Sequence, residues 1–62
     1  MDRSNEIIQY VDNLLQDKES IDTKDVMNGL NVSKQEIFIA LYTKGGYAIT
    51  GALTNYGTIS KL

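Results

Sequence analysis

The stretch LNVSKQEIFIALY, residues 30–42, contains the strongest local pattern in the chain. Within it, Ser33 and Glu36 have the S-x-x-E spacing of a capping box, in which each side chain bonds the backbone N–H of the other residue. This pattern predicts a helix that begins at Lys34 and ends near Lys44. A glycine pair follows Lys44, and glycine readily adopts the left-handed conformation that terminates helices.

A short helix is expected before this one. It is capped by Asp22 or Thr23, runs for about two turns and ends near Gly29 or Leu30. Asn31 comes next, and asparagine tolerates the left-handed conformation that a tight turn requires. The chain therefore predicts two helices joined by the turn LNVS.

The N-terminal stretch SNEIIQYVDNLLQDK predicts a further, amphipathic helix. Ser4 is its expected N-cap, and Glu6 suits the positive end of the helix dipole. The opposite face of this helix is polar. The apolar side chains recur at helical spacing and form one stripe: Ile7, Ile8, Val11, Leu14 and Leu15.

The sequence pattern changes after Gly46. β-branched and aromatic residues with scattered glycines predict two short strands, near 47–52 and 57–62, joined by a turn around TNYG. We therefore predict an α+β fold: a three-helix winged helix-turn-helix with a C-terminal β-hairpin wing. Residues 1–62 form a single domain in this interpretation, since 62 residues are close to the lower limit for one hydrophobic core.

Composition excludes several classes of function. The chain has neither cysteine nor histidine, so the usual zinc and transition-metal ligands and most nucleophile–base pairs are absent. We expect no enzymatic activity, no metal and no cofactor. No apolar run approaches the roughly 18 residues of a membrane span, so no membrane partner is expected. Met1 suggests a complete small gene product in the cytoplasm.

The formal net charge of −2 hides an asymmetry between the two parts of the chain. Residues 1–25 contain three basic and seven acidic side chains, whereas residues 26–62 contain three lysines and one glutamate. The local net charges are therefore −4 and +2. A polyanion, if one is bound, should contact the C-terminal part.

The stretch 23–42 resembles the helix-turn-helix of phage and bacterial regulators. More specifically, LNVSKQEIFIALY is similar to the recognition region of Zα-type winged helices, found in poxvirus host-range proteins and in an RNA-editing adenosine deaminase. The resemblance implies a winged-helix fold, a phosphate contact from Lys34 and a base contact from Tyr42. Phe38 stands where that family has asparagine, and Ile59 is nearest to its tryptophan position. The resemblance also suggests a viral or mobile-element origin and, in that case, a location in the host cytoplasm.

The first functional hypothesis is a small transcriptional regulator, expected to be dimeric, that binds double-stranded DNA. The helix at 34–44 would lie in the major groove, where Lys34 and Gln35 are in the first turn and can reach base edges and phosphates. The hairpin wing would lie on the DNA backbone. The candidate DNA-binding residues are Ser33, Lys34, Gln35, Phe38, Tyr42, Lys44, Asn55 and Lys61.

The alternative hypothesis is a winged helix that binds protein, such as a viral or phage antagonist or adaptor. The helix at 34–44 has six consecutive apolar or aromatic residues, more than one packed face can bury. Exposed apolar side chains on a helix usually mark a partner surface, and aromatic residues often anchor one. The candidate partner or dimer interface is Phe38, Ile39 and Tyr42. The acidic face of the first helix is a second possible interface.

Overall fold

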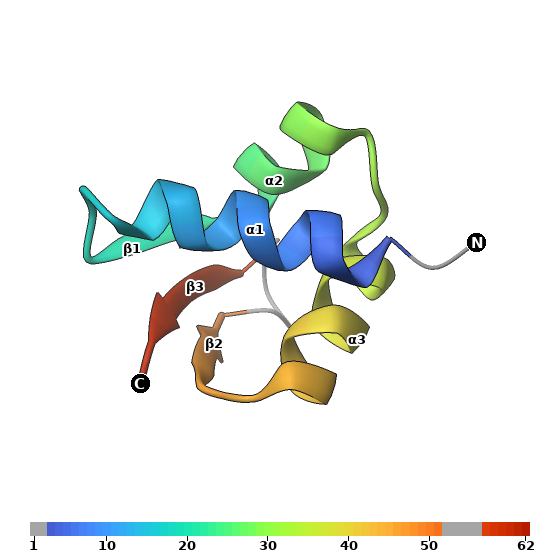
Figure 1. The fold of residues 1–62 in the computed structure, drawn as a ribbon. Helices are drawn as coiled ribbons and strands as arrows, with labels where there is room; N and C mark the ends of the chain where they lie inside the picture. The colour runs from blue at the N-terminus through green and yellow to red at the C-terminus, as the bar shows by residue number, and fades with distance from the viewer. Residues whose placement is uncertain (1–2, 52–56) are drawn as a thin grey trace.

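The computed structural model describes residues 3–51 and 57–62 (Figure 1). These residues form an α+β fold of three helices and a three-stranded antiparallel sheet. The elements in chain order are α1 (Ser4–Leu15), β1 (Ser20–Asp22), α2 (Thr23–Leu30), α3 (Lys34–Lys44), β2 (Tyr47–Thr50) and β3 (Thr58–Lys61). Within the described ranges, no helix is long and apolar enough to cross a membrane.

The sheet has the order β1-β3-β2, so the last strand of the chain lies in the middle (Figure 1). Ile59 of β3 pairs with Ile21 on one side and with Ile49 on the other. The hairpin strands are shorter than the predicted 47–52 and 57–62 but occupy the same region. Residues 54–56 of the expected TNYG turn lie outside the described residues. Strand β1 is an element that the sequence analysis did not predict.

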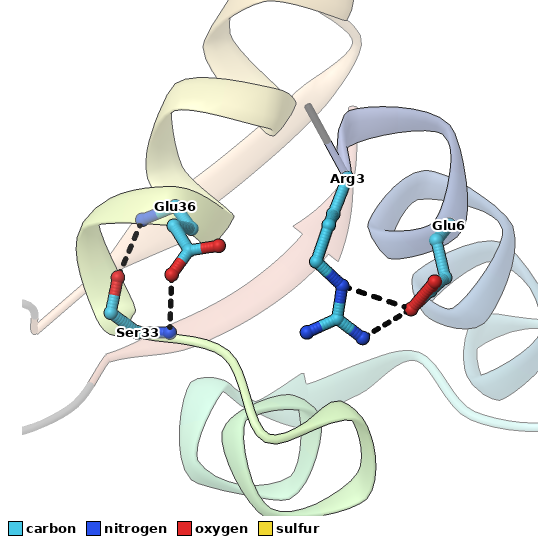
Figure 2. A network of polar contacts seen from close by, with 4 residues as sticks. All are labelled: Arg3, Glu6, Ser33 and Glu36. Carbon is cyan, nitrogen blue, oxygen red and sulfur yellow. Dashed lines mark hydrogen bonds and ion pairs between the residues drawn. The ribbon is translucent and has the colours of Figure 1, made fainter. Parts of the chain in front are cut away.

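Helix α1 has the predicted amphipathic face, but the prediction of Ser4 as its N-cap is wrong. The N-cap residue is Arg3, and Ser4 is the first helical residue. The Arg3 side chain makes no capping hydrogen bond; its guanidinium pairs instead with the Glu6 carboxylate (Figure 2). On the inner face, Ile7 and Val11 are fully buried.

The turn between α2 and α3 has the expected geometry. Asp22 occupies the N-cap position of α2, without a capping hydrogen bond from its side chain. Asn31 has φ 55° and ψ 49°, the left-handed conformation predicted for it. The backbone N–H of Val32 then donates to the carbonyl oxygen of Met27 at 3.3 Å. Helix α2 thus ends at Leu30, and α3 begins four residues later at Lys34.

Helix α3 begins and ends where the sequence predicted. Its capping box is complete: the Glu36 N–H donates to the Ser33 hydroxyl at 3.1 Å, and the Ser33 N–H donates to a Glu36 carboxylate oxygen at 3.3 Å (Figure 2). Gly45 ends the helix with φ 78° but with an extended ψ of 166°, so the cap has a positive φ without being a left-handed helical residue.

The core lies between α1, α3 and the sheet. Helix α3 inserts its inner face here, and the side chain of Ile59 covers the core from the central strand. The buried apolar residues come from every helix, from β1, from β3 and from the turn before α3: Ile7, Val11, Ile21, Val26, Val32, Ile37, Ala40, Leu41 and Ile59. This packing fixes which side of α3 faces outward.

Candidate interaction face of helix α3

One side of α3 carries large apolar side chains that the fold does not cover. Ile39 and Tyr42 are 63% and 69% exposed, and Gln35 beside them is also exposed. Residues at this spacing lie on one side of a helix. The buried side chains Ile37 and Leu41 lie on the opposite side. We define the outward face of α3 as Gln35, Phe38, Ile39 and Tyr42.

Aromatic contacts order one edge of this outward face. The Phe38 ring is half-buried and packs against the hydrophobic core. Its centroid is 6.3 Å from that of Tyr42, with the ring planes tilted by 53°. The Lys34 Nζ lies 5.6 Å from the Phe38 centroid, within cation–π range. Lys34, Phe38 and Tyr42 therefore form a continuous row, one helical turn apart from each other.

The first turn of α3 is held by its cap. Both the hydroxyl and the backbone N–H of Ser33 are engaged with Glu36. Ser33 therefore has a structural role that accounts for its position before the helix. Gln35 points away from the core and is exposed. Lys34 and Gln35 are the side chains of this turn that a ligand on the outward face could meet first.

A second polar cluster lies at the base of the hairpin. The Tyr47 hydroxyl donates to Asp12 Oδ1 at 2.5 Å, and the Lys61 Nζ lies 3.4 Å from the same oxygen. Tyr47 and Lys61 are direct partners in the β2–β3 register. Asp12 belongs to α1, so this cluster connects the first helix to both strands of the hairpin.

The pKa values of two groups in this cluster depart from their ordinary values. The hydrogen bond from Tyr47 is the main cause that lowers the pKa of Asp12, and the positive charges of Lys61 and Lys44 act in the same direction. Partial burial opposes this shift. Burial and the bond to Asp12 raise the pKa of Tyr47 to about 12. The cluster is thus a hydrogen-bonded anion with nearby cations, and it stabilises the fold.

The structure brings only some of the predicted DNA-binding residues together. Ser33, Lys34 and Gln35 are in the first turn of α3, and Phe38 and Tyr42 follow on the same helix. The remaining candidates are Lys44, Lys61 and Asn55. Lys44 is the last residue of α3, about 15 Å along the helix from Lys34 at 1.5 Å per residue.

Lys61 is at the hairpin base with Asp12, whereas Asn55 lies outside the described residues. The sequence analysis missed Asp12 as the partner of Lys61. Asp12 lies on the polar side of α1, and its neighbours in sequence give no indication that it makes a long-range contact. Nothing in the pattern of β3 indicated that its lysine would be paired either.

The outward face of α3 can bind by apolar contact, by aromatic stacking and through a few polar groups. In the part of the chain that the structure describes, no group of three or more histidine, cysteine, aspartate or glutamate side chains could hold a metal ion. Comparison with known protein families, curated proteins and solved structures finds no match to this chain.

Proposed function

We propose that this protein is a protein-binding module and that its partner docks on the outward face of α3. The observation that carries this proposal is the exposure of Ile39 and Tyr42, two large side chains on a helix whose ends and inner face are fixed. Burying such side chains at an interface removes apolar area from water, at about 25 cal/mol per Å². The half-buried Phe38 would extend this contact.

We further propose that the fold is a winged helix-turn-helix. Three features support this assignment: the α2–α3 pair joined by a left-handed Asn31, the hairpin that follows α3, and the pairing of β3 with the short strand β1 before α2. In this interpretation α3 is the second helix of the motif, the helix that such folds project outward. A partner protein and a nucleic acid would then compete for the outward face of α3.

The charge distribution favours a protein over a nucleic acid on this face. Duplex binding depends on several lysine or arginine contacts to phosphates. Here the chain has a net charge of −2, and Lys61 is paired with Asp12 on α1. Lys44 stands at the far end of α3 from Lys34 and contributes to the field at Asp12. Of the two large exposed residues of this face, Ile39 has no polar group and Tyr42 has one neutral hydroxyl, so neither adds positive charge for a phosphate.

A second candidate function is DNA binding by a small transcriptional regulator. Lys34 and Gln35 favour it, because they lie in the first turn of the second helix, where base and phosphate contacts usually originate. Gln35 is exposed and could pair with adenine. Lys34, Lys44 and the hairpin would then contact the DNA backbone.

Site-specific photo-crosslinking tests the proposed function. A benzophenone amino acid replaces Ile39 in one variant and the exposed Gln9 of α1 in a matched control, and both are irradiated in the cells that produce the protein. We expect a discrete crosslinked protein product from position 39 and none from position 9. A correctly folded position-39 variant without any protein product would overturn the proposal.

A duplex titration followed by amide NMR tests the second candidate function. At low salt, protein docking on α3 predicts no duplex-induced shifts on this helix. Shifts clustered on residues 33–38 and Lys44 that disappear as salt is raised would instead support DNA binding. The two experiments thus separate the two classes of partner.

A further inference from the structure

We infer that Asp12 is a specificity-determining residue that keeps phosphate-bearing polyanions off the base of the hairpin. Its carboxylate takes the place that a phosphate oxygen would otherwise occupy beside Tyr47 and Lys61. These residues lie outside the outward face of α3. The inference therefore goes beyond the proposed function and does not depend on the partner that docks on that face.

Two donors converge on one oxygen of Asp12. The Tyr47 hydroxyl donates to Oδ1 at 2.5 Å, and the Lys61 Nζ lies 3.4 Å from the same atom. The two side chains are brought together by the hairpin, because Tyr47 and Lys61 are direct partners in the register of β2 and β3. Ammonium and hydroxyl groups are among the donors that proteins use to bind phosphate oxygens. The hairpin thus presents a pair of anion-binding groups, and α1 supplies the anion.

Lys44, the last residue of α3, adds a second positive charge near this carboxylate. The hydrogen bond from Tyr47 and the charges of Lys61 and Lys44 all lower the pKa of Asp12, so the carboxylate is ionised at neutral pH. Residues 26–62 contain three lysines, and two of them therefore lie in the field of one acidic side chain from α1. At the hairpin base, α1 partly neutralises the positive part of the chain.

A dissolved anion can reach this cluster from solvent. The side chains of Lys61 and Asp12 are 57% and 35% exposed, and Lys44 is exposed as well. A phosphate group that approached Lys61 would also meet the Asp12 carboxylate, and the two negative charges would repel. One unit charge at about 4 Å in water changes an affinity roughly fivefold. Asp12 therefore opposes anion binding at the hairpin base while it stabilises the fold.

An amide NMR titration with tripolyphosphate at low salt tests this inference. Asp12→Asn removes the charge, keeps the shape of the side chain and leaves an oxygen that can accept from Tyr47. We expect this variant to bind tripolyphosphate about fivefold more tightly than the wild type, with shifts on residues 44–47 and 58–62. The matched control is Asp17→Asn, an exposed substitution just after α1 with the same change of net charge. It should leave the affinity at the wild-type value.

Three further variants separate the charge of Asp12 from its structural role. Asp12→Asn combined with Lys61→Gln should lose the gain in affinity, because the ammonium group that binds the anion is removed. Tyr47→Phe breaks the hydrogen bond to Asp12 but keeps the carboxylate, so it should bind tripolyphosphate no better than the wild type. Asp12→Ala removes the charge in a second way and suits the middle of a helix. Circular dichroism verifies that each variant is folded.

Equal affinities of the wild type and the two charge-removing variants of Asp12 would overturn the inference. An equal gain from Asp17→Asn would also overturn it, because net charge alone would then explain the effect. A gain that survives Lys61→Gln would overturn the hairpin base as the site. The same titration with a short DNA duplex distinguishes the source of the phosphate. A gain for both ligands supports exclusion of nucleic acid, and a gain for tripolyphosphate alone supports exclusion of free phosphates only.

These results are separate from the crosslinking test of the outward face. A protein crosslink from position 39, together with no effect of Asp12→Asn on anion binding, would overturn only this inference and leave the proposed function standing. A gain from Asp12→Asn without any protein crosslink would overturn the proposed function and leave this inference standing.

Discussion

Tyr47→Phe removes one hydroxyl from the Asp12–Tyr47–Lys61 cluster and leaves the ring that packs against the core. The lost hydrogen bond, 2.5 Å to Asp12 Oδ1, has a charged acceptor. Such bonds stabilise proteins by about 1.5–3 kcal/mol. Asp12 is 35% exposed, so water screens the interaction. We therefore expect a loss of about 1 kcal/mol in the free energy of unfolding at neutral pH.

The pH dependence gives a sharper test of the same bond. Burial and the bond to Asp12 raise the pKa of Tyr47 from 10.0 to about 12 in the folded protein. Because the pKa of Tyr47 is higher in the folded protein, its protonated hydroxyl contributes its full stabilisation to the fold below pH 10. This contribution is lost as the pH rises from 10 to 12. At pH 11 the phenol is about nine-tenths ionised when unfolded and about one-tenth ionised when folded. At about 1.36 kcal/mol per pKa unit, the fold loses up to about 1.4 kcal/mol between pH 8 and pH 11.

Urea unfolding of the wild type and Tyr47→Phe at pH 8 and pH 11 measures this loss. All other titrating groups are common to both proteins, so the difference between their pH dependences isolates Tyr47. We expect the wild type to lose about 1 kcal/mol more than the variant. Equal losses in the two proteins between pH 8 and pH 11 would refute the reasoning.

The Asp12 carboxylate acts on the acid side. Because its pKa is lowered in the folded protein, its contribution to stability is present above pH 3.8 and is lost as the pH falls below that value.

Three further substitutions test the packing that positions α3. Ser33→Ala removes the cap of α3 and should lower the free energy of unfolding by about 1 kcal/mol in urea denaturation. The buried Thr23 hydroxyl has no hydrogen-bond partner in the described part of the chain. Thr23→Val should therefore raise the free energy of unfolding by about 1 kcal/mol and raise the melting temperature. A lower melting temperature would contradict this. A Cβ at Gly29 would come within 2.5 Å of Tyr10 Cζ. Gly29→Ala should therefore destabilise the wild type. In a Tyr10→Ala variant the same substitution should stabilise the fold by about 1 kcal/mol, because alanine has the higher helix propensity. An effect of the same sign in both backgrounds would exclude the steric explanation.

The start of helix α3 at Lys34 and its end near Lys44 could be predicted because both depend on neighbours in sequence. Ser33 and Glu36 satisfy each other within one turn, and Gly45 follows the last helical residue. The left-handed turn residue Asn31 was predictable for the same reason. Each of these features follows from the chemistry of a few adjacent side chains, without reference to the rest of the fold.

Strand β1 could not be predicted in this way. It has three residues, and it forms because Ile21 pairs with Ile59, 38 positions later in the chain. Three residues are too few for an alternating pattern to be recognised. The prediction of the N-cap of α1 failed for a local reason. Ser4 is a favourable capping residue by type, but Arg3 takes that position and its side chain pairs with Glu6, three residues later.

The candidate site was predictable in part. An excess of apolar residues on α3 indicated that some would remain exposed, and Ile39 and Tyr42 are the ones that do. Which residues they are follows from the helical period and from the direction of the core. The position of Lys61 was not predictable, because its carboxylate partner, Asp12, comes from a helix 49 positions earlier.

A docked protein partner and a duplex would require the same surface, and their competition can be measured. A partner that covers Ile39 and Tyr42 also covers the outward face beside Lys34 and Gln35, so only the unoccupied protein could enter a major groove. Duplex binding, if present, should therefore weaken as the concentration of the protein partner rises through its dissociation constant. Salt acts differently on the two complexes. The logarithm of duplex affinity falls by about 0.9 per phosphate contact for each tenfold rise in salt. A contact centred on apolar side chains is far less sensitive. A partner complex that weakened as steeply with salt as a duplex would mean that lysine contacts, and not Ile39 and Tyr42, hold it together.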